Sequence, residues 1–255
     1  MSKMPLLFIG HGSPMNAIEK NSFTNTWAEI AARIPRPEAI VCVSAHWTTD
    51  GSCVSDNEHP KTVHDIYGFP QALYEVKYDA PGAPEIAYML RELAPNVRID
   101  NSWGIDHGAW SVLRVMFPGA DVPLIQISLN LKGDRRYHFE LGQKLKALRE
   151  KGVLILGSGN VVHNLGRINW DMSGGYAWAQ EFDDYIRENV ERREFQNVVD
   201  YGKAGKSAQE AFYTTEHFDP LLYVLGASDE KDSLTVFNNE CVLGSLSMTC
   251  YLFEA

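Results

Sequence analysis

AIVCVSAHW (residues 39–47) is an apolar run, rich in β-branched side chains, that ends near a histidine. β-Branched residues pack well on a pleated sheet, and a run without polar alternation is typical of a buried strand. Similar runs occur at PLLFIG (5–10), VPLIQISL (122–129) and VLILGS (153–158). The sequence therefore predicts a buried central sheet.

Helical stretches separate these strand-like runs, at residues 22–34, 84–94, 136–150 and 176–192. Alternating strands and helices are typical of parallel sheets whose connecting helices cover the faces. Two later segments, SLTVF (233–237) and SLSMTCYLFE (245–254), follow turn signals with no helix between them, which indicates an antiparallel hairpin. We expect an α/β fold with one domain over residues 1–255, a mostly parallel central sheet flanked by helices, and a C-terminal antiparallel hairpin.

Composition and charge exclude several classes of protein. With 255 residues, 45% hydrophobic and 22% charged, the chain resembles an ordinary globular protein with one large core. A net charge of −10 argues against a nucleic-acid binder, which needs a basic surface. The first apolar run meets His11 and Gly12 before it is long enough for a signal peptide or a membrane span. We expect a cytoplasmic protein without nucleic-acid or membrane partners, and the composition leaves its oligomeric state open.

Histidines follow three of the predicted strands. His11 comes directly after PLLFIG, His46 lies at the end of AIVCVSAHW, and His163 follows VLILGSGNVV. Open α/β sheets bind ligands at the carboxyl ends of their strands, so these positions are stronger candidates than histidines elsewhere. A neutral imidazole is a common metal ligand, and an unbound one can act as a general acid or base near neutral pH. The pattern indicates a metal or acid–base site at this edge of the sheet.

Two further histidines, His217 in TTEHFDPLL and His107 in WGIDHGAW, stand where helices are expected to begin. An isolated histidine is more often a structural, hydrogen-bonded residue than a ligand, and this alternative stays open for both. We interpret His59 and His138 as structural, hydrogen-bonded residues of this kind.

The glycine-rich segments GHGS (10–13) and GSGN (157–160) match no phosphate-binding motif, and small residues also allow backbone to approach a metal or substrate closely.

Six segments together carry a resemblance over nearly the whole chain. They are HGSPMN (11–16), SAHW (44–47), HDIYGFP (64–70), GIDHGAW (104–110), GSGNVVHNL (157–165) and EHFDPLLYVLGA (216–227). In this order they resemble the DODA-type family, the 4,5-DOPA extradiol dioxygenases related to the LigB-like class III ring-cleaving enzymes. The resemblance implies one catalytic α/β domain with a non-haem divalent metal. It also implies oxygen-dependent ring opening of a catechol, such as 3,4-dihydroxyphenylalanine (DOPA) to 4,5-seco-DOPA.

The resemblance also implies functions for individual residues. His11, His46 and His217 are similar to metal ligands of the family, with Glu216 as an alternative ligand to His217 because distant class III enzymes use a glutamate there. His163 is similar either to a fourth ligand or to the acid–base histidine above the catechol. An all-histidine set suits Zn²⁺ as well as Fe²⁺, and Fe²⁺ is expected for turnover because zinc has no redox chemistry.

Further residues are expected around the catechol. His107 is a second catalytic candidate, and His64, Tyr67 and Trp110 are candidates for substrate binding, the two aromatic residues as a wall against the ring. The expected partners are a small-molecule catechol and O₂. Two alternatives use the same ligands: a zinc hydrolase with Asp106 or Glu216 as base, and a non-catalytic metal-binding interaction protein.

Overall fold

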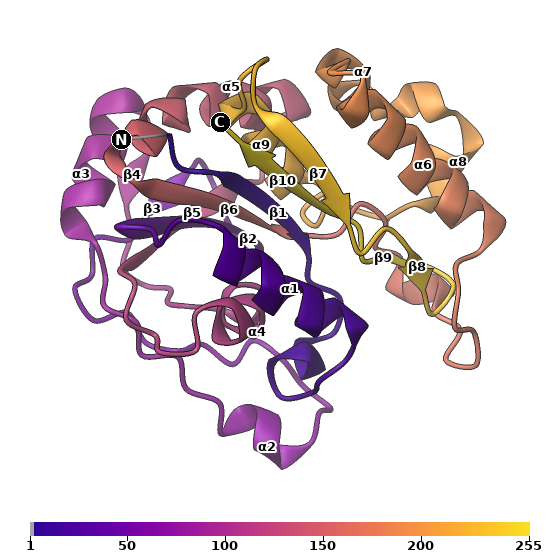
Figure 1. Ribbon diagram of the computed structural model, residues 1–255, viewed down its shortest axis with the longest axis horizontal. Helices are drawn as coiled ribbons and strands as arrows, with labels where there is room; N and C mark the ends of the chain where they lie inside the picture. Colours follow the sequence, from indigo (N-terminus) through magenta and orange to yellow (C-terminus); the bar gives the residue numbers. More distant parts are fainter. Residues whose placement is uncertain (1–2) are drawn as a thin grey trace.

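The structure is a computed structural model that describes residues 3–255. Its centre is an eight-stranded sheet with the strand order β4-β3-β5-β2-β6-β1-β10-β7 (Figure 1). The four middle strands run parallel to one another, and each overlaps one of the predicted apolar runs. These strands are β1 (Leu6–Gly10), β2 (Ala39–Thr49), β5 (Leu124–Asn130) and β6 (Val153–Gly159).

Shorter strands extend the sheet on both sides. β3 (Cys53–Val54) pairs antiparallel with β5 and parallel with β4 (Arg98–Ile99). On the other side, β10 (Cys250–Glu254) pairs antiparallel with both β1 and β7 (Ser233–Phe237). The α/β class, the mostly parallel sheet and the C-terminal antiparallel pairing are therefore confirmed.

The strand predicted over residues 245–254 is two strands in the structure. β9 (Leu246–Ser247) leaves the main sheet and forms a two-stranded hairpin with β8 (Cys241–Val242). Leu243 and Gly244 join them at positive φ, 51° and 79°, which suits a tight hairpin turn. The apolar pattern predicted strand conformation here, but the change of pairing partner depends on tertiary contacts.

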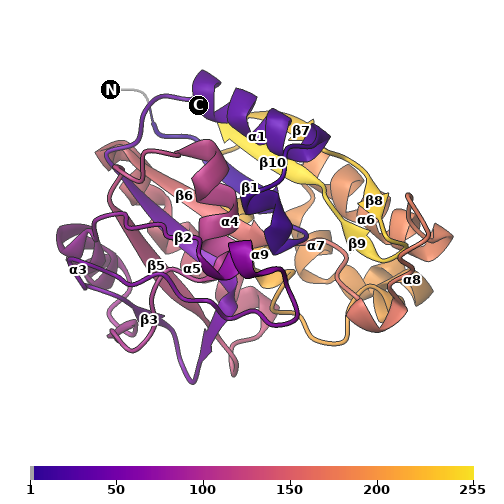
Figure 2. The same ribbon diagram turned by 90° about the horizontal axis from the view of Figure 1, so that it is seen from below.

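Helices cover both faces of the sheet (Figures 1 and 2). α1 (Ser22–Arg33) and α4 (His107–Met116) pack on one face, and α5 (Arg135–Leu145) and α9 (Asp219–Ala227) pack on the other. The described chain also contains α2 (Gln71–Tyr74), α3 (Pro84–Leu93), α6 (Ala177–Glu191), α7 (Phe195–Val199) and α8 (Lys206–Glu210), and the 3₁₀ turns η1 (Pro14–Ala17), η2 (Lys146–Lys151), η3 (Leu165–Arg167) and η4 (Tyr201–Ala204).

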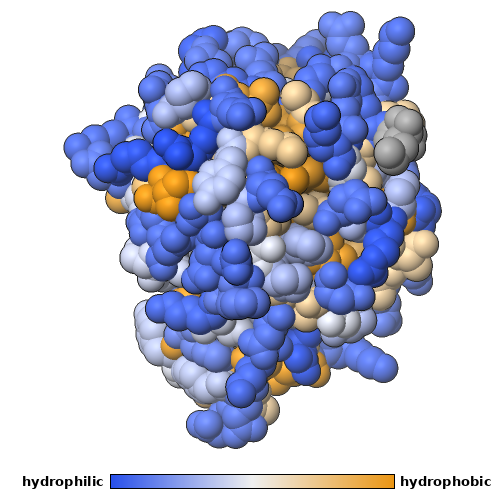
Figure 3. Space-filling view, turned by 90° about the vertical axis from the view of Figure 1, so that its left-hand side faces the viewer, coloured by the Kyte–Doolittle hydropathy of each residue, from blue (hydrophilic) through white to orange (hydrophobic). Residues whose placement is uncertain are grey.

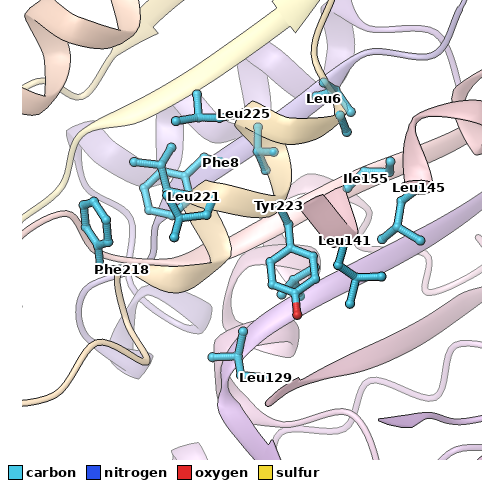
Figure 4. Close-up of a cluster of buried hydrophobic side chains, with 14 of the residues drawn as sticks. Leu6, Phe8, Leu129, Leu141, Leu145, Ile155, Phe218, Leu221, Tyr223 and Leu225 are labelled. Carbon is cyan, nitrogen blue, oxygen red and sulfur yellow. The ribbon is translucent and has the colours of Figure 1, made fainter. Parts of the chain in front are cut away.

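The hydrophobic core lies in two layers, one on each face of the sheet. In β1, Leu6 and Phe8 belong to the layer beneath α5 and α9, which Figure 4 shows with Leu221 of α9, whereas Leu7 and Ile9 belong to the opposite layer. All four β1 side chains have no exposed surface. Both faces of the strand are therefore buried, which explains why its sequence is continuously apolar.

The surface is largely polar on the side of the molecule where α3 lies. Figure 3 shows this face as mostly hydrophilic, with small, separated apolar patches. Within residues 3–255, every helix is too short or too polar to cross a membrane. On this face, the apolar side chains form no large continuous exposed surface.

Candidate metal centre

His11 lies directly after β1 and is 1% exposed. Its Nδ1 is 3.0 Å from the hydroxyl of Ser158, and that hydroxyl donates its proton to the carbonyl of Gly108 at 2.5 Å. A hydroxyl has one proton, so Ser158 can only accept from the His11 ring. The His11 proton is therefore on Nδ1, and Nε2 carries the free lone pair.

His46 lies in β2, where the pairing with β5 shifts register between Val43 and Thr48. Such irregularities in a strand redirect side chains and are frequent beside active sites. The His46 Nε2 lies 3.4 Å from the Nε2 of His11. A β carbon on Gly108 would lie 2.8 Å from the His46 ring, so the absence of a side chain at Gly108 allows this position.

His217 approaches from the loop before α9 and is 6% exposed. Its carbonyl accepts from the backbone N–H of Asn160 at 2.8 Å, and a β carbon on Gly159 would lie 2.0 Å from that oxygen. The GSGN segment thus allows two backbones to approach closely, as the sequence suggested. The Nδ1 of His217 is buried without a hydrogen-bond partner among the described residues, as expected for a nitrogen that binds a ligand.

The ring nitrogens of His11, His46 and His217 lie within 4.8 Å of one another. Burial lowers the pKa of each ring well below the usual value for histidine, and repulsion from neighbouring histidines lowers it further. All three imidazoles are therefore neutral at pH 7, and each offers a ring nitrogen within the same small region. This donor set fits a divalent metal of the zinc or iron type.

His163 and Glu216 lie beside this set but are not part of it. The ring of His163 stacks on that of His217, with centroids 3.5 Å apart and planes within 4°. Burial lowers the pKa of His163 to about 4, and His107 contributes to the shift. The carboxylate of Glu216 accepts from the Thr214 hydroxyl at 2.8 Å, and its side chain is 34% exposed. Of the adjacent pair, His217 is the residue that converges with His11 and His46.

His107 is the first residue of α4 and is paired with a carboxylate that the sequence analysis did not single out. The Oδ2 of Asp65 lies 2.9 Å from the His107 Nδ1 and 3.6 Å from the His46 Nδ1. Burial raises the pKa of Asp65, but the hydrogen bonds that it accepts from the ring and the backbone N–H of His107 lower it, and the net pKa is below its usual value. The only local signal for Asp65 was its place in the HDIYGFP segment.

Asp106 is fully buried and caps the N-terminus of α4. Its carboxylate accepts from Ser44 at 2.6 Å, Gln126 at 2.7 Å, Trp103 at 3.0 Å and the backbone N–H of Ala109 at 3.2 Å. Burial raises its pKa, and the charge of Asp65 raises it further. Because its lone pairs are occupied by these donors, Asp106 is poorly placed to serve as the base of a hydrolase.

The three substrate-binding candidates lie in different environments. The Nε2 of His64 is 2.9 Å from the carbonyl of Val76, and its ring centroid is 5.9 Å from that of Trp110. Trp110 is fully buried, donates to the carbonyl of Val63 at 2.9 Å, and has its ring centroid 6.3 Å from that of His107. Tyr67 is 90% exposed. His64 and Trp110 thus form a row leading from His107, whereas Tyr67 projects into solvent.

Comparison with known proteins gives one consistent family. Residues 4–248 match the catalytic LigB subunit of aromatic ring-opening dioxygenase. The chain is 44% identical to 4,5-DOPA dioxygenase extradiol of Escherichia coli (strain K12), over 97% of this chain and 93% of that protein. It is 35% identical to the protein of the same name from Beta vulgaris, over 97% and 96% of the two chains.

A solved structure agrees with these sequence matches. The crystal structure of an uncharacterized protein from Escherichia coli K12 superimposes with a TM-score of 0.86 at 41% identity, covering 98% of this chain and 99% of that chain. Together the matches favour ring opening over hydrolysis or non-catalytic metal binding. The chain therefore belongs to the LigB family of aromatic ring-opening dioxygenases and is a metal-dependent extradiol ring-cleavage enzyme that acts on a small molecule and O₂.

Proposed function

We propose that His11, His46 and His217 hold one divalent metal and that the enzyme opens the ring of DOPA to 4,5-seco-DOPA. The convergence of three neutral imidazoles within 4.8 Å is the observation that carries this proposal. The names of the relatives from Escherichia coli and Beta vulgaris, which specify 4,5-DOPA, support the choice of catechol. Extradiol cleavage breaks the ring beside the two hydroxyl groups and adds both atoms of O₂ to the product.

A bound iron(II) ion would bring the catechol and O₂ together and supply the redox chemistry of the reaction. The chain must then accept a proton from a catechol hydroxyl and return one later. His163 and His107 are the imidazoles beside the three ligands that can do so. With its pKa lowered to about 4, His163 is neutral at pH 7 and has a lone pair for this proton.

Ring geometry supports His163 as a proton-transfer residue and not as a fourth ligand. The lone pair of an imidazole nitrogen lies in the plane of the ring. The parallel rings of His163 and His217 have centroids 3.5 Å apart, so a cation in the plane of one ring lies well outside the plane of the other. His217, whose nitrogen converges with those of His11 and His46, takes the ligand position in this proposal.

The substrate would contact the loop that carries His64 and Tyr67. The exposed ring of Tyr67 is free to pack on an aromatic substrate, and the buried ring of Trp110 supports His64 from behind. Aromatic rings and a few polar groups are the usual lining of a small-molecule site. In this proposal His64 and Tyr67 contact the substrate, and Trp110 packs beside His64 as its support.

The test compares two metal-loaded forms of the full chain. Iron(II)-reconstituted protein and rigorously iron-free zinc protein are each given DOPA in air-saturated buffer, and oxygen uptake and visible absorbance are followed together. We expect the iron(II) form to consume one O₂ per DOPA and form a yellow product, whose structure by NMR gives the bond cleaved. The zinc form should be inactive. Equal rates for the two forms, or DOPA loss without oxygen uptake, would contradict the proposal.

A further inference from the structure

One carboxylate, that of Asp65, lies beside two histidines of the site, His107 and His46. Asp65 Oδ1 accepts the backbone N–H of His107 at 3.0 Å, and Oδ2 lies 2.9 Å from the Nδ1 of the same residue. The Nδ1 of His46 is 3.6 Å from Oδ2, which is too long for a hydrogen bond. The His46 Nε2 faces His11, so Asp65 is beside the other nitrogen of that ring.

Backbone hydrogen bonds already hold the two segments together, without any contribution from Asp65. Val63 donates to the carbonyl of Ile105 and Ile105 donates to the carbonyl of Lys61, both at 2.8 Å. Thr62 and Ile105 form a parallel bridge, which brings the residues that follow each of them side by side. The contact between the Asp65 carboxylate and the His107 ring is therefore not needed to keep the segment in place.

A carboxylate accepts hydrogen bonds and cannot donate them when ionised. The ring nitrogen of His107 that faces Asp65 must therefore carry a proton, and in the neutral ring the other nitrogen, Nε2, has the lone pair. An imidazole in the opposite tautomer would present an N–H group and could not accept a proton from a substrate hydroxyl. The same logic explains why an aspartate beside a general-base histidine matters in other enzymes.

We propose that Asp65 is a positioning residue that keeps the proton of His107 on Nδ1, so that Nε2 accepts a proton from the catechol. This inference rests on the proposed function of His107 in proton transfer. Asp65, His46 and His107 also offer ligand atoms within 4.8 Å of one another, but the inference assigns the carboxylate to the His107 proton, because its two oxygens accept from the backbone and the ring of that residue. Loss of the carboxylate should therefore lower turnover more than metal retention.

The variant Asp65→Asn separates the ring contact from the backbone contact. The amide keeps one acceptor but replaces the other with an NH₂ donor. The backbone N–H of His107 is always a donor, whereas the ring can move its proton from Nδ1 to Nε2. The amide oxygen of the variant should therefore accept from the backbone N–H, and its NH₂ group should face the ring. The ring must then accept at Nδ1 and carry its proton on Nε2. Asp65→Glu keeps both acceptors, and Asp79→Asn, an exposed carboxylate between α2 and α3, serves as the matched control.

The first measurement is ¹⁵N NMR of the histidines in the zinc-loaded full chain, which is diamagnetic, with the His107 signals assigned through His107→Gln. We expect a proton on Nδ1 in the wild type and on Nε2 in Asp65→Asn. A wild-type proton on Nε2 would overturn the inference, without any variant and without any assay of activity. An unchanged tautomer in folded Asp65→Asn would overturn it as well.

The second measurement is steady-state turnover of the iron(II) form with DOPA. We expect kcat of Asp65→Asn to fall by roughly 10²–10⁴, the usual contribution of a general acid or base, with KM and metal content within about threefold of wild type. Asp65→Glu should restore part of kcat, and Asp79→Asn should match wild type. A merely structural function would lower the melting temperature and leave kcat unchanged, which would contradict the inference. Inactive wild-type enzyme would contradict the proposed function, and the NMR result would still decide the inference on Asp65.

Discussion

The imidazole of His163 lies flat on that of His217, with ring centroids 3.5 Å apart and an angle of 4° between the planes. The two residues come from different parts of the fold, His163 from the segment after β6 and His217 from the loop before α9. Backbone bonds hold both: His163 donates to the carbonyl of Ala211, and His217 accepts from Asn160. Because the two rings are stacked, a metal in the plane of one ring lies outside the plane of the other. Substitution of His163 and of His217 should therefore affect metal retention differently.

We expect His217→Ala to lose its metal and His163→Gln to keep it. Removing a ligand weakens metal binding directly, whereas removing a proton-transfer residue should lower kcat by roughly 10²–10⁴ with metal still bound. The measurement is the metal-to-protein ratio after dialysis, together with kcat in excess iron(II). Metal loss of equal extent in both folded variants would make His163 a fourth ligand.

Ser158→Ala should weaken metal binding through His11. The Ser158 hydroxyl is the acceptor that keeps the His11 proton on Nδ1, and loss of such an outer partner typically costs 10–100-fold in metal affinity. Competition with a chelator measures this affinity. Ser111→Ala is the matched control, since Ser111 is also fully buried but its hydroxyl has no hydrogen-bond partner among the described residues. Equal affinities for the two variants would argue against the function assigned to Ser158.

Gly108→Ala should displace His46 and reduce metal affinity. The new β carbon would lie 2.5 Å from the Ser44 hydroxyl and 2.8 Å from the His46 ring, both closer than side chains tolerate. Overpacking of this kind also costs about 1–3 kcal/mol in the free energy of unfolding. Gly174→Ala is the control, because no heavy atom lies within 4 Å of its added β carbon. Unchanged metal affinity in Gly108→Ala would show that His46 can shift without loss of binding.

His138 should make the protein less stable in acid. Burial lowers its pKa from 6.5 to about 4, so between these values the unfolded chain binds a proton that the folded chain does not. Stability from this group is thus present above pH 6.5 and is lost as the pH falls toward 4, by about 2 kcal/mol between pH 7 and pH 5.

The measurement is the free energy of unfolding in urea at pH 7 and pH 5 for wild type and His138→Gln. The wild type also contains site histidines with lowered pKa, so the test is the difference in pH dependence between the two proteins and not the absolute value. The His138→Gln protein should lose about 2 kcal/mol less than wild type over this interval. Identical pH dependence would mean that His138 titrates alike in the folded and unfolded chains.

The sequence by itself determined the central sheet and the direction of its middle strands. AIVCVSAHW and the runs like it are apolar without alternation because both faces of each strand are buried, and burial on both faces requires helices on both sides. The same runs end near His11, His46 and His163, so the sequence also located the edge of the sheet where these residues lie. Each of these signals is local, carried by neighbours along the chain.

Only the tertiary structure decided which side chains meet at that edge. Asp65 and His107 are 42 positions apart, and His11 and Ser158 are 147 positions apart, so no sequence spacing records their hydrogen bonds. The choice between Glu216 and His217 as the converging residue likewise depends on how the loop before α9 passes against Gly159. Periodicity reports whether a residue is buried, but a hydrogen bond between distant segments depends on the register in which the strands and loops are brought together.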